Sequence, residues 1–220
     1  MHSTRIFFLI SLTLIIANYT FSQRNSEPCY FDLHTNTESR EDAEVLIQQQ
    51  VAILKSRVTR GADTARVIPV VVHIIHAGGT ENISKAQILS QITVLNEDFR
   101  KITGTNGDGN GVDTQVEFCL AKIDPNGKCT DGIVRVFSSQ TNHQSYQRLK
   151  LKELSFWDNT KYLNIYVVKT INGGVKGYSS FPGGPPNEDG IVVKHNYFGK
   201  SGTASGSGRE MTHEVGHWLG

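Results

Sequence analysis

Two histidines and a glutamate stand at a spacing that suits metal-assisted hydrolysis. His213 and His217 lie four residues apart in the run HEVGHWLG, and Glu214 follows the first of them. On a helix, side chains at i and i+4 share one face, so both imidazoles can present a nitrogen to one zinc ion. Glu214 is turned about 100° away around the helix. It is better placed to take a proton from an activated water, as a general base, and this HExxH spacing is typical of zinc peptidases.

The flanking residues fit a helix that carries this motif. Glu210–His217 suits a helix, and the run GKSGTASGSG before it suits a flexible loop, with Ser205 or Ser207 available near the N-cap. Gly220 can end the helix in the left-handed conformation, and the extended pattern HExxHxxGxxH would then place a third ligand at position 223. We therefore expect a truncated fragment of a longer protease. Two structural histidines on an ordinary helix are the alternative.

The first 22 residues have the features of a secretory signal peptide. Arg5 precedes an apolar stretch, Ile6–Ile16, and small residues follow near the expected cleavage position. The stretch is short of the ~20 residues that span a bilayer, so a membrane anchor is the weaker alternative. We expect a secreted, extracellular protein with no membrane contact after the signal is removed.

Charge gives no reason to expect a polyanionic partner. The chain has 22 basic and 21 acidic residues, and loss of Arg5 with the signal leaves 21 of each. Such a balance does not suggest nucleic acid or an anionic surface. Proteins or peptides are the expected partners, and the oligomeric state stays open.

Residues 23–66 form a polar segment between the signal and the main domain. One stretch of helical periodicity runs from Glu41 to about Lys55, and the segment ends in the basic run Ser56–Arg66. A single helix cannot make a core, so the composition suits a pro-segment that rests on a larger domain and is removed at an exposed basic residue. A plain N-terminal extension is the alternative.

From Val67 onward, strand and helix patterns alternate. Val67–Ile75 is a continuous β-branched run typical of a strand buried on both faces, and an amphipathic helix opens at Ser84. Further strands are expected at Val116–Ile123, Ile133–Phe137, Leu163–Val168 and Ile191–Lys194, with a helix near Tyr146–Phe156. The pattern predicts an α/β fold in which a mixed sheet is backed by helices around one core.

Export permits disulfides, and the chain has three cysteines. Cys119 and Cys129 flank IDPNG, a turn sequence that can close a hairpin, so we expect a local bridge between them. Pairing with a downstream cysteine is the alternative. Cys29 is then left over.

Other polar residues carry weaker signals. The run Thr103–Asp113 has acidic and amide residues at spacings of a calcium loop but lacks the EF-hand glutamate, so a mobile surface loop is favoured and calcium stays a second candidate cofactor. His73 and His76 lie in or beside a buried strand and are interpreted as structural. Nothing marks His143 or His195 as a ligand.

Several segments, together with the zinc motif, resemble the pappalysin family of metzincin zinc endopeptidases. The resemblance covers most of 67–220 and implies an upper, N-terminal subdomain whose lower, C-terminal partner is missing. It also implies a twisted, mixed, mostly parallel five-stranded sheet with a backing helix and an active-site helix. The segments are VIPVVVHIIH (67–76), LNEDFRK (95–101), FCLAKIDPNGKCTDGI (118–133), YLNIYVV (162–168), GYSSFPGGPPNEDGIVVKHNYFG (177–199) and the terminal helix.

The resemblance implies roles for individual residues. His213 and His217 would bind zinc, and Glu214 would polarise the attacking water. A pro-segment cysteine, here Cys29, would ligate zinc in the latent form, although Tyr and Phe follow it where the family has Gly and Thr; a free or intermolecular cysteine is the alternative. An edge strand would bind the peptide substrate by strand addition, and it comprises Gly177, Tyr178, Ser179 and Ser180.

The expected activity is that of a secreted zinc-dependent metalloendopeptidase made as a zymogen. Three alternatives stay open. One is a zinc peptidase of the gluzincin type, whose third ligand is a glutamate farther along the chain. The others are an inactive fragment and a non-catalytic secreted adhesion or inhibitor-like module. The 220 residues by themselves are expected to be inactive.

Overall fold

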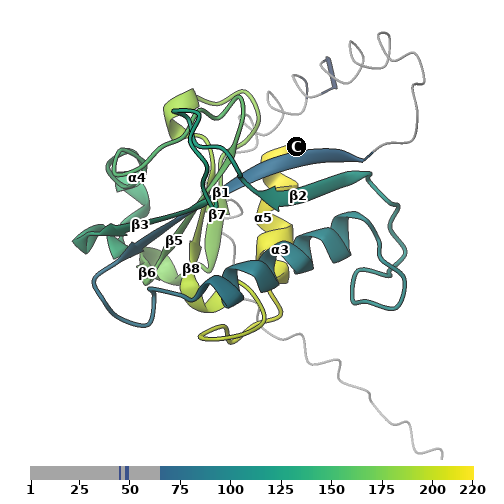
Figure 1. Cartoon of the computed structure of the whole chain (residues 1–220), viewed down its shortest axis with the longest axis horizontal. Coiled ribbons are helices and arrows are strands. Elements are labelled where there is room, and N and C mark those ends of the chain that lie inside the picture. The colour runs from purple at the N-terminus through teal and green to yellow at the C-terminus, as the bar shows by residue number, and fades with distance from the viewer. Residues whose placement is uncertain (1–44, 46–47, 50–64) are drawn as a thin grey trace, which may run out of the picture.

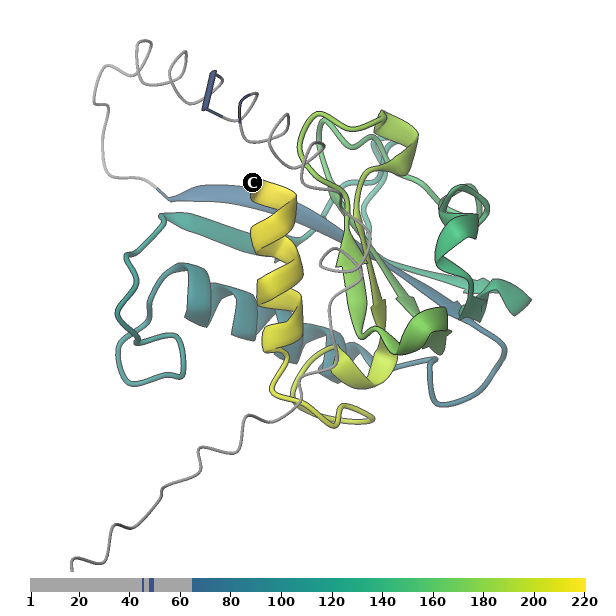
Figure 2. The same ribbon diagram turned by 180° about the vertical axis from the view of Figure 1, so that it is seen from behind.

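The computed structural model describes residues 65–220 together with Val45, Gln48 and Gln49. The predicted signal peptide, Cys29 and nearly all of the predicted pro-segment lie outside the described residues. In the described part, one twisted sheet has two helices on one face, α3 (Lys85–Phe99) and α5 (Arg209–Leu219), and the short α4 (Arg148–Lys152) on the other (Figures 1 and 2). The predicted α/β class is confirmed.

The sheet has the strand order β2-β1-β5-β8-β7, with β3 also paired to β1. Every pairing is parallel except that of β7 with β8, which is antiparallel, so the predicted mostly parallel sheet is confirmed. Its strands are β1 (Arg66–His76), β2 (Val116–Leu120), β3 (Ile133–Phe137), β5 (Leu163–Val168), β7 (Gly177–Ser179) and β8 (Ile191–Lys194). A separate two-stranded sheet pairs β4 (Asn142–His143) with β6 (Thr170–Ile171).

Within residues 65–220 the sheet has six strands where five were predicted, because two short strands share one side of β1. β2 pairs with β1 up to Val70, and β3 takes over from Val72. At the junction Ala121 N donates to Val70 O at 2.8 Å, and Val72 N donates to Gly132 O at 2.9 Å. The residues between Ala121 and Gly132 leave the sheet as a hairpin. Two strands, β2 and β3, therefore pair one after the other with the same side of β1, and this hairpin separates them in the sequence.

Two apolar clusters fill the two faces of the sheet. The larger one joins β1, β5 and β8 to the apolar side of α3 and to Met211 and Val215 of α5. The smaller one lies under α4 and includes Leu151, Tyr166 and Tyr178. Short 3-10 helices connect the elements at Ser139–Thr141, Ser145–Gln147, Asn172–Gly174, Pro186–Glu188 and His195–Tyr197.

Two predicted elements are shorter in the structure because long-range partners end them. The predicted helix 146–156 is α helix only over Arg148–Lys152, since Ser155 Oγ turns to His73 Nδ1 at 2.8 Å and Trp157 N donates to Asn164 Oδ1 at 3.0 Å. The predicted strand Val116–Ile123 ends at Leu120, because the following residues form the hairpin. A buried polar pair and a change of partner strand therefore set both boundaries.

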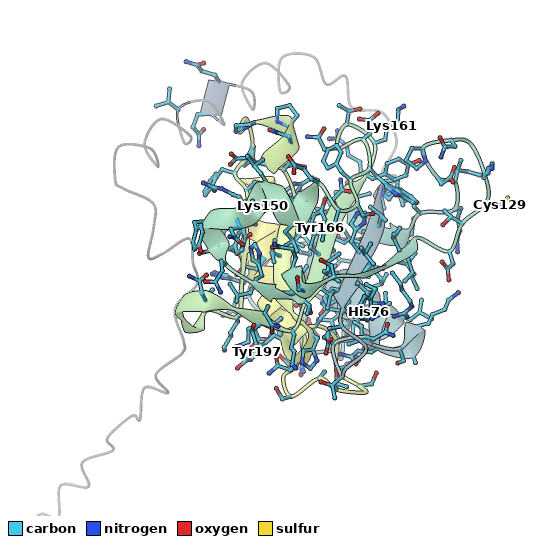
Figure 3. The ribbon with its side chains drawn as sticks, turned by 90° about the vertical axis from the view of Figure 1, so that its left-hand side faces the viewer. His76, Cys129, Lys150, Lys161, Tyr166 and Tyr197 are labelled. Carbon is cyan, nitrogen blue, oxygen red and sulfur yellow. The ribbon has the colours of Figure 1, made fainter. Side chains whose placement is uncertain are left out.

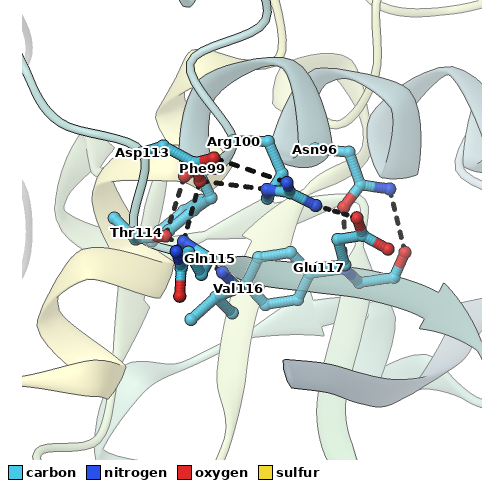
Figure 4. A network of polar contacts seen from close by, with 9 residues as sticks. Asn96, Phe99, Arg100, Asp113, Thr114, Gln115, Val116 and Glu117 are labelled. Atoms are coloured by element: carbon cyan, nitrogen blue, oxygen red, sulfur yellow. Dashed lines mark hydrogen bonds and ion pairs between the residues drawn. The ribbon is translucent and has the colours of Figure 1, made fainter. Parts of the chain in front are cut away.

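The connection between α3 and β2 is held by a polar network (Figure 4). Arg100 Nε donates to Asp113 Oδ1 at 2.9 Å, and its guanidinium also contacts Glu117. Asn96 bonds both the N–H of Phe118, at 2.7 Å, and its carbonyl, at 2.9 Å. The hydrogen bond from Arg100 is the main cause of a lowered pKa for Asp113. The Asp113 carboxylate, one of the residues considered for a calcium loop, is thus engaged by an arginine.

The predicted Cys119–Cys129 bridge does not form, and both thiols are free. Ile123 pairs with Cys129 across the hairpin, and Thr130 N donates to Lys122 O at 3.0 Å. Because this register places Ile123 opposite Cys129, Cys119 lies four residues farther along, roughly 13 Å away at ~3.3 Å per residue. Figure 3 shows Cys129 at the outer end of the hairpin. Pairing with a downstream cysteine stays a prediction.

No helix among the described residues has the length and apolar character required to cross a bilayer.

His73 has a structural role, as expected. It is fully buried in β1, and its ring stacks on Tyr166 with centroids 4.7 Å apart. Its Nε2 lies 2.9 Å from Asn164 Oδ1, which can only accept, so Nε2 carries the proton and Nδ1 accepts from Ser155. Burial outweighs the Asn164 hydrogen bond and lowers the pKa of His73 to about 4. Burial, aided by Lys152, lowers the pKa of His143 to about 4 as well.

We expect the free energy of unfolding to fall as the pH drops from about 6.5 towards 4. Over that range these histidines become protonated in the unfolded chain, whereas in the folded chain they stay buried and neutral. Acid therefore favours unfolding. The full effect for His73 is about 3 kcal/mol. Urea titrations at pH 7 and pH 4.5 measure it. A His73→Gln variant should show a weaker pH dependence than the wild type, and equal dependences would contradict the assignment.

Candidate active site

The helix that carries His213, Glu214 and His217 is α5, as predicted. Its N-cap is Gly208, with φ of 79°, whereas Ser207 Oγ accepts only a long hydrogen bond of 3.4 Å from Arg209 N. A Cβ on Gly208 would lie 3.0 Å from Gln91 Oε1. Glycine is thus required where the helix begins, both for its left-handed backbone and for the close approach of α3.

The loop before α5 is held by two buried glutamines of α3. Gln87 Nε2 donates to the carbonyls of His195, at 2.9 Å, and of Phe198, at 2.8 Å. Gln91 Nε2 donates to Gly208 O at 3.0 Å, and Gln91 Oε1 accepts from Gly199 N at 2.6 Å. This segment was predicted to be a flexible loop. The structure instead fixes its two ends, and with them the start of the helix.

The helix α5 lies along the edge strand β7 and the residues on either side of it. Residues of the β7 segment contact residues of α5 in the same sequence order, so the two segments run in the same direction. Lys176 Nζ pairs with Glu210 Oε1 at 3.4 Å, and a Cβ on Gly177 would lie 3.4 Å from Glu214 Cγ. One turn later, the rings of Phe181 and His217 are 6.1 Å apart. The edge strand and the helix therefore run side by side through the candidate site.

The two histidines converge. Their Nε2 atoms are 3.0 Å apart, and their rings meet edge to face with centroids at 4.5 Å. His213 is exposed and His217 half-buried. Two nitrogens bound to one tetrahedral zinc at about 2.0–2.1 Å would be separated by roughly 3.3–3.4 Å. A small change in the side-chain angles would therefore let both imidazoles bind one ion.

Glu214 lies on the neighbouring face of α5. It is 3% exposed and packs against β7 at Gly177. The carboxylate therefore lies beside the edge strand at Gly177. Among the described residues no group of three or more His, Cys, Asp or Glu side chains is placed to hold a metal ion.

Beyond His217, the contact between the β7 edge and α5 is made through Asp189, a residue that the sequence did not mark. Asp189, just before β8, accepts hydrogen bonds at Oδ1 from Ser180 Oγ, at 3.1 Å, and from Trp218 Nε1, at 3.0 Å. Ser180 follows β7, and Trp218 follows His217 along α5. No spacing rule connects these residues; only the packing of β7, β8 and α5 brings them together.

Comparisons with known proteins agree with this geometry. The family model described as Peptidase_M43, Pregnancy-associated plasma protein-A, matches residues 126–220. A promirolysin mutant of Tannerella forsythia is 32% identical, with a TM-score of 0.69, and the match covers 88% of this chain and 67% of that one. Mature mirolysin of the same organism, in complex with a cleaved peptide, is 38% identical with a TM-score of 0.64, covering 72% and 64%.

Sequence relatives point the same way. An extracellular metalloprotease of Arthroderma otae is 25% identical over 179 residues, which are 77% of this chain and 56% of that protein. The chain spans about half the length of the curated relatives it matches. The likeness of the fold to mirolysin places it in the metzincin class of metallopeptidases. Within that class the chain belongs to the pappalysin family, which rules out the gluzincin alternative.

Proposed function

We propose that the chain is the upper, N-terminal part of a secreted zinc-dependent endopeptidase, made with an N-terminal pro-segment that keeps it latent. The observation that carries the proposal is the 3.0 Å approach of the two imidazole nitrogens, with Glu214 on the next face of the same helix. Family membership supports a metalloprotease, and the relatives' description as extracellular supports export.

In this proposal His213 and His217 hold the zinc ion through Nε2. A catalytic zinc has three protein ligands and an open position. We propose that the third ligand comes from outside these 220 residues, at the position that the extended motif gives it. Cys29 stays a candidate for the ligand that fills the open position in the latent form.

Glu214 acts as the proton carrier. When bound, zinc supplies Lewis acidity that acidifies water and polarises the scissile carbonyl. Glu214 takes a proton from the attacking water and returns it to the leaving amine. Its burial against β7 fixes the carboxylate beside the strand on which the substrate is expected to lie.

The edge strand β7 offers the substrate a defined set of backbone groups. The register pairs Tyr178 with Val192, and Ser180 N donates to Gly190 O at 3.1 Å, so the even-numbered residues face β8. Because antiparallel hydrogen bonds alternate, the N–H and C=O groups of Gly177 and Ser179 point away from β8. An extended peptide can pair with them as an added strand, which suits cleavage within a chain.

The test uses the full-length polypeptide and a peptide blocked at both termini, with a fluorophore and a quencher on either side of its centre. We expect internal cleavage by protein that contains one zinc ion per chain. A folded protein that binds zinc and cleaves no peptide in a broad library would favour the non-catalytic binding module. Cleavage only of peptides with a free terminus would contradict an endopeptidase.

A further inference from the structure

The short helix α4 carries a buried lysine. Lys152 is 2% exposed, and its Nζ donates to the carbonyl of Glu188 in the loop between β7 and β8. The same loop is held by Arg148, whose Nε pairs with Glu188 Oε2 at 3.2 Å. Burial of a cation is unfavourable unless it is compensated by hydrogen bonds or an opposite charge. Burial lowers the pKa of Lys152 to about 8, and the charge of Asp189 opposes this shift. A methionine would fill the space without that cost.

The loop that Lys152 holds joins the neighbouring strands β7 and β8 beside the candidate site. Its first residues follow β7, and Asp189 lies two residues before Ile191, where β8 begins. α4 contacts it from one face, and Trp218 of α5 contacts it from the other through the 3.0 Å hydrogen bond to Asp189. Figure 2 shows the loop towards the same end of the molecule as the C-terminal end of α5.

Asp189 is the point at which these contacts meet. A single carboxylate oxygen accepts from Ser180, at the end of the edge strand, and from Trp218, next to His217. Ser180 Oγ also accepts from Gly190 N at 2.8 Å, and this bond fixes the turn that carries Asp189 before β8. A shift of Asp189 would move both the strand end and the indole.

We propose that Lys152 and Asp189 are positioning residues for the active site, which together set the distance between the edge strand and the histidine-bearing end of α5. Lys152 holds the loop through the carbonyl of Glu188 and places a positive charge near the Asp189 carboxylate. Asp189 in turn holds Ser180 and Trp218 through its two hydrogen bonds. The inference rests on the proposed peptidase function, because only a substrate on β7 and a zinc ion on α5 make that distance important.

The test compares Lys152→Met, Asp189→Asn and the double variant in the full-length, zinc-loaded protein. The matched control is Lys150→Met, an exposed lysine of the same helix (Figure 3). The indole ¹H–¹⁵N resonance of Trp218, identified by its loss in Trp218→Phe, reports the hydrogen bond to Asp189 without reference to activity. Melting temperature and the separate values of kcat and KM complete the set.

We expect Lys152→Met and Asp189→Asn to shift the Trp218 resonance and to lower kcat by about ten- to a hundredfold, the range for a displacement of up to about an ångström. The double variant should be no worse than the worse single one, since the two residues act together. Lys150→Met should match the wild type. A lower melting temperature with unchanged Trp218 resonance and unchanged kcat would show a purely structural role and overturn the proposal.

Two further outcomes separate this proposal from the proposed function. If Lys152→Met does not fold, the nearly isosteric Asp189→Asn decides the question through the same resonance. If the wild-type protein shows the Trp218 resonance but hydrolyses no peptide, the peptidase function fails. The resonance shifts then still show whether the Lys152–Asp189–Trp218 contacts act as a unit.

Discussion

Replacement of Glu214 by glutamine is expected to lower kcat/KM for peptide hydrolysis by about 10²–10⁴-fold, the usual contribution of a general base. Glutamine has nearly the same shape and keeps the packing against Gly177, but its amide cannot accept a proton from water at neutral pH. Both imidazoles stay in place, so zinc content should not change. Steady-state kinetics and metal analysis on the same protein preparation measure the two effects separately.

The matched control for this variant is Glu210→Gln. Glu210 lies one turn earlier on α5, and its contact is an ion pair of 3.4 Å with Lys176. Partly exposed pairs of this kind contribute about 0–1 kcal/mol, so stability should change little and activity should stay near the wild-type value. Undiminished hydrolysis by zinc-loaded Glu214→Gln would remove Glu214 from the mechanism. Equal losses in both variants would indicate a general effect of charge on α5.

Residue pattern predicted the buried parts of the fold well. β3, β5 and β8 have the predicted bounds, Ile133–Phe137, Leu163–Val168 and Ile191–Lys194. β5 and β8 are covered on both faces, so apolar, β-branched side chains are favoured along most of their length. The start of α3 was also predictable, because Ser84 Oγ accepts from Gln87 N at 3.2 Å in the expected capping geometry.

The errors arose where register or a distant partner decides the structure. A turn between Cys119 and Cys129 was correctly inferred, but the sequence does not specify that Ile123 faces Cys129, and that register keeps the thiols apart. Likewise, helical periodicity continues beyond Lys152, while the buried His73 draws Ser155 out of the helix. The residue pattern of a segment indicates the structure that the segment favours by itself. It does not show the distant partner that changes this structure in the folded protein.

In the candidate site, too, some residues could be predicted from the sequence and others could not. The two imidazoles and Glu214 could be placed from spacing alone, because one helix carries all three. Gln87 and Gln91 were missed, although two glutamines at i and i+4 among the apolar residues of α3 were a usable signal for buried hydrogen bonds. Asp189 had no such signal, since its partners lie nine residues before it and twenty-nine residues after it.

Gly177→Val is expected to lower kcat/KM by about 10²-fold, because it acts on the contact between the edge strand and the general base. A Cβ at Gly177 would lie 3.0 Å from Val192 O and 3.4 Å from Glu214 Cγ, so even alanine is tight. The extra methyl groups of valine can be accommodated only if Glu214 is displaced or β7 separates from β8. Gly177→Ala should therefore have an intermediate effect in the same kinetic assay.

The comparison that identifies the cause of this loss is the double variant Gly177→Val/Glu214→Gln. If Gly177 matters because it leaves room for the carboxylate, the double variant should be no slower than Glu214→Gln alone. Gly109→Val is the control, since that glycine has open space around it in a surface loop. Wild-type kinetics in Gly177→Val would mean that α5 and β7 do not pack together during catalysis. Fully additive losses would mean that Gly177 acts through substrate pairing on the strand, independently of Glu214.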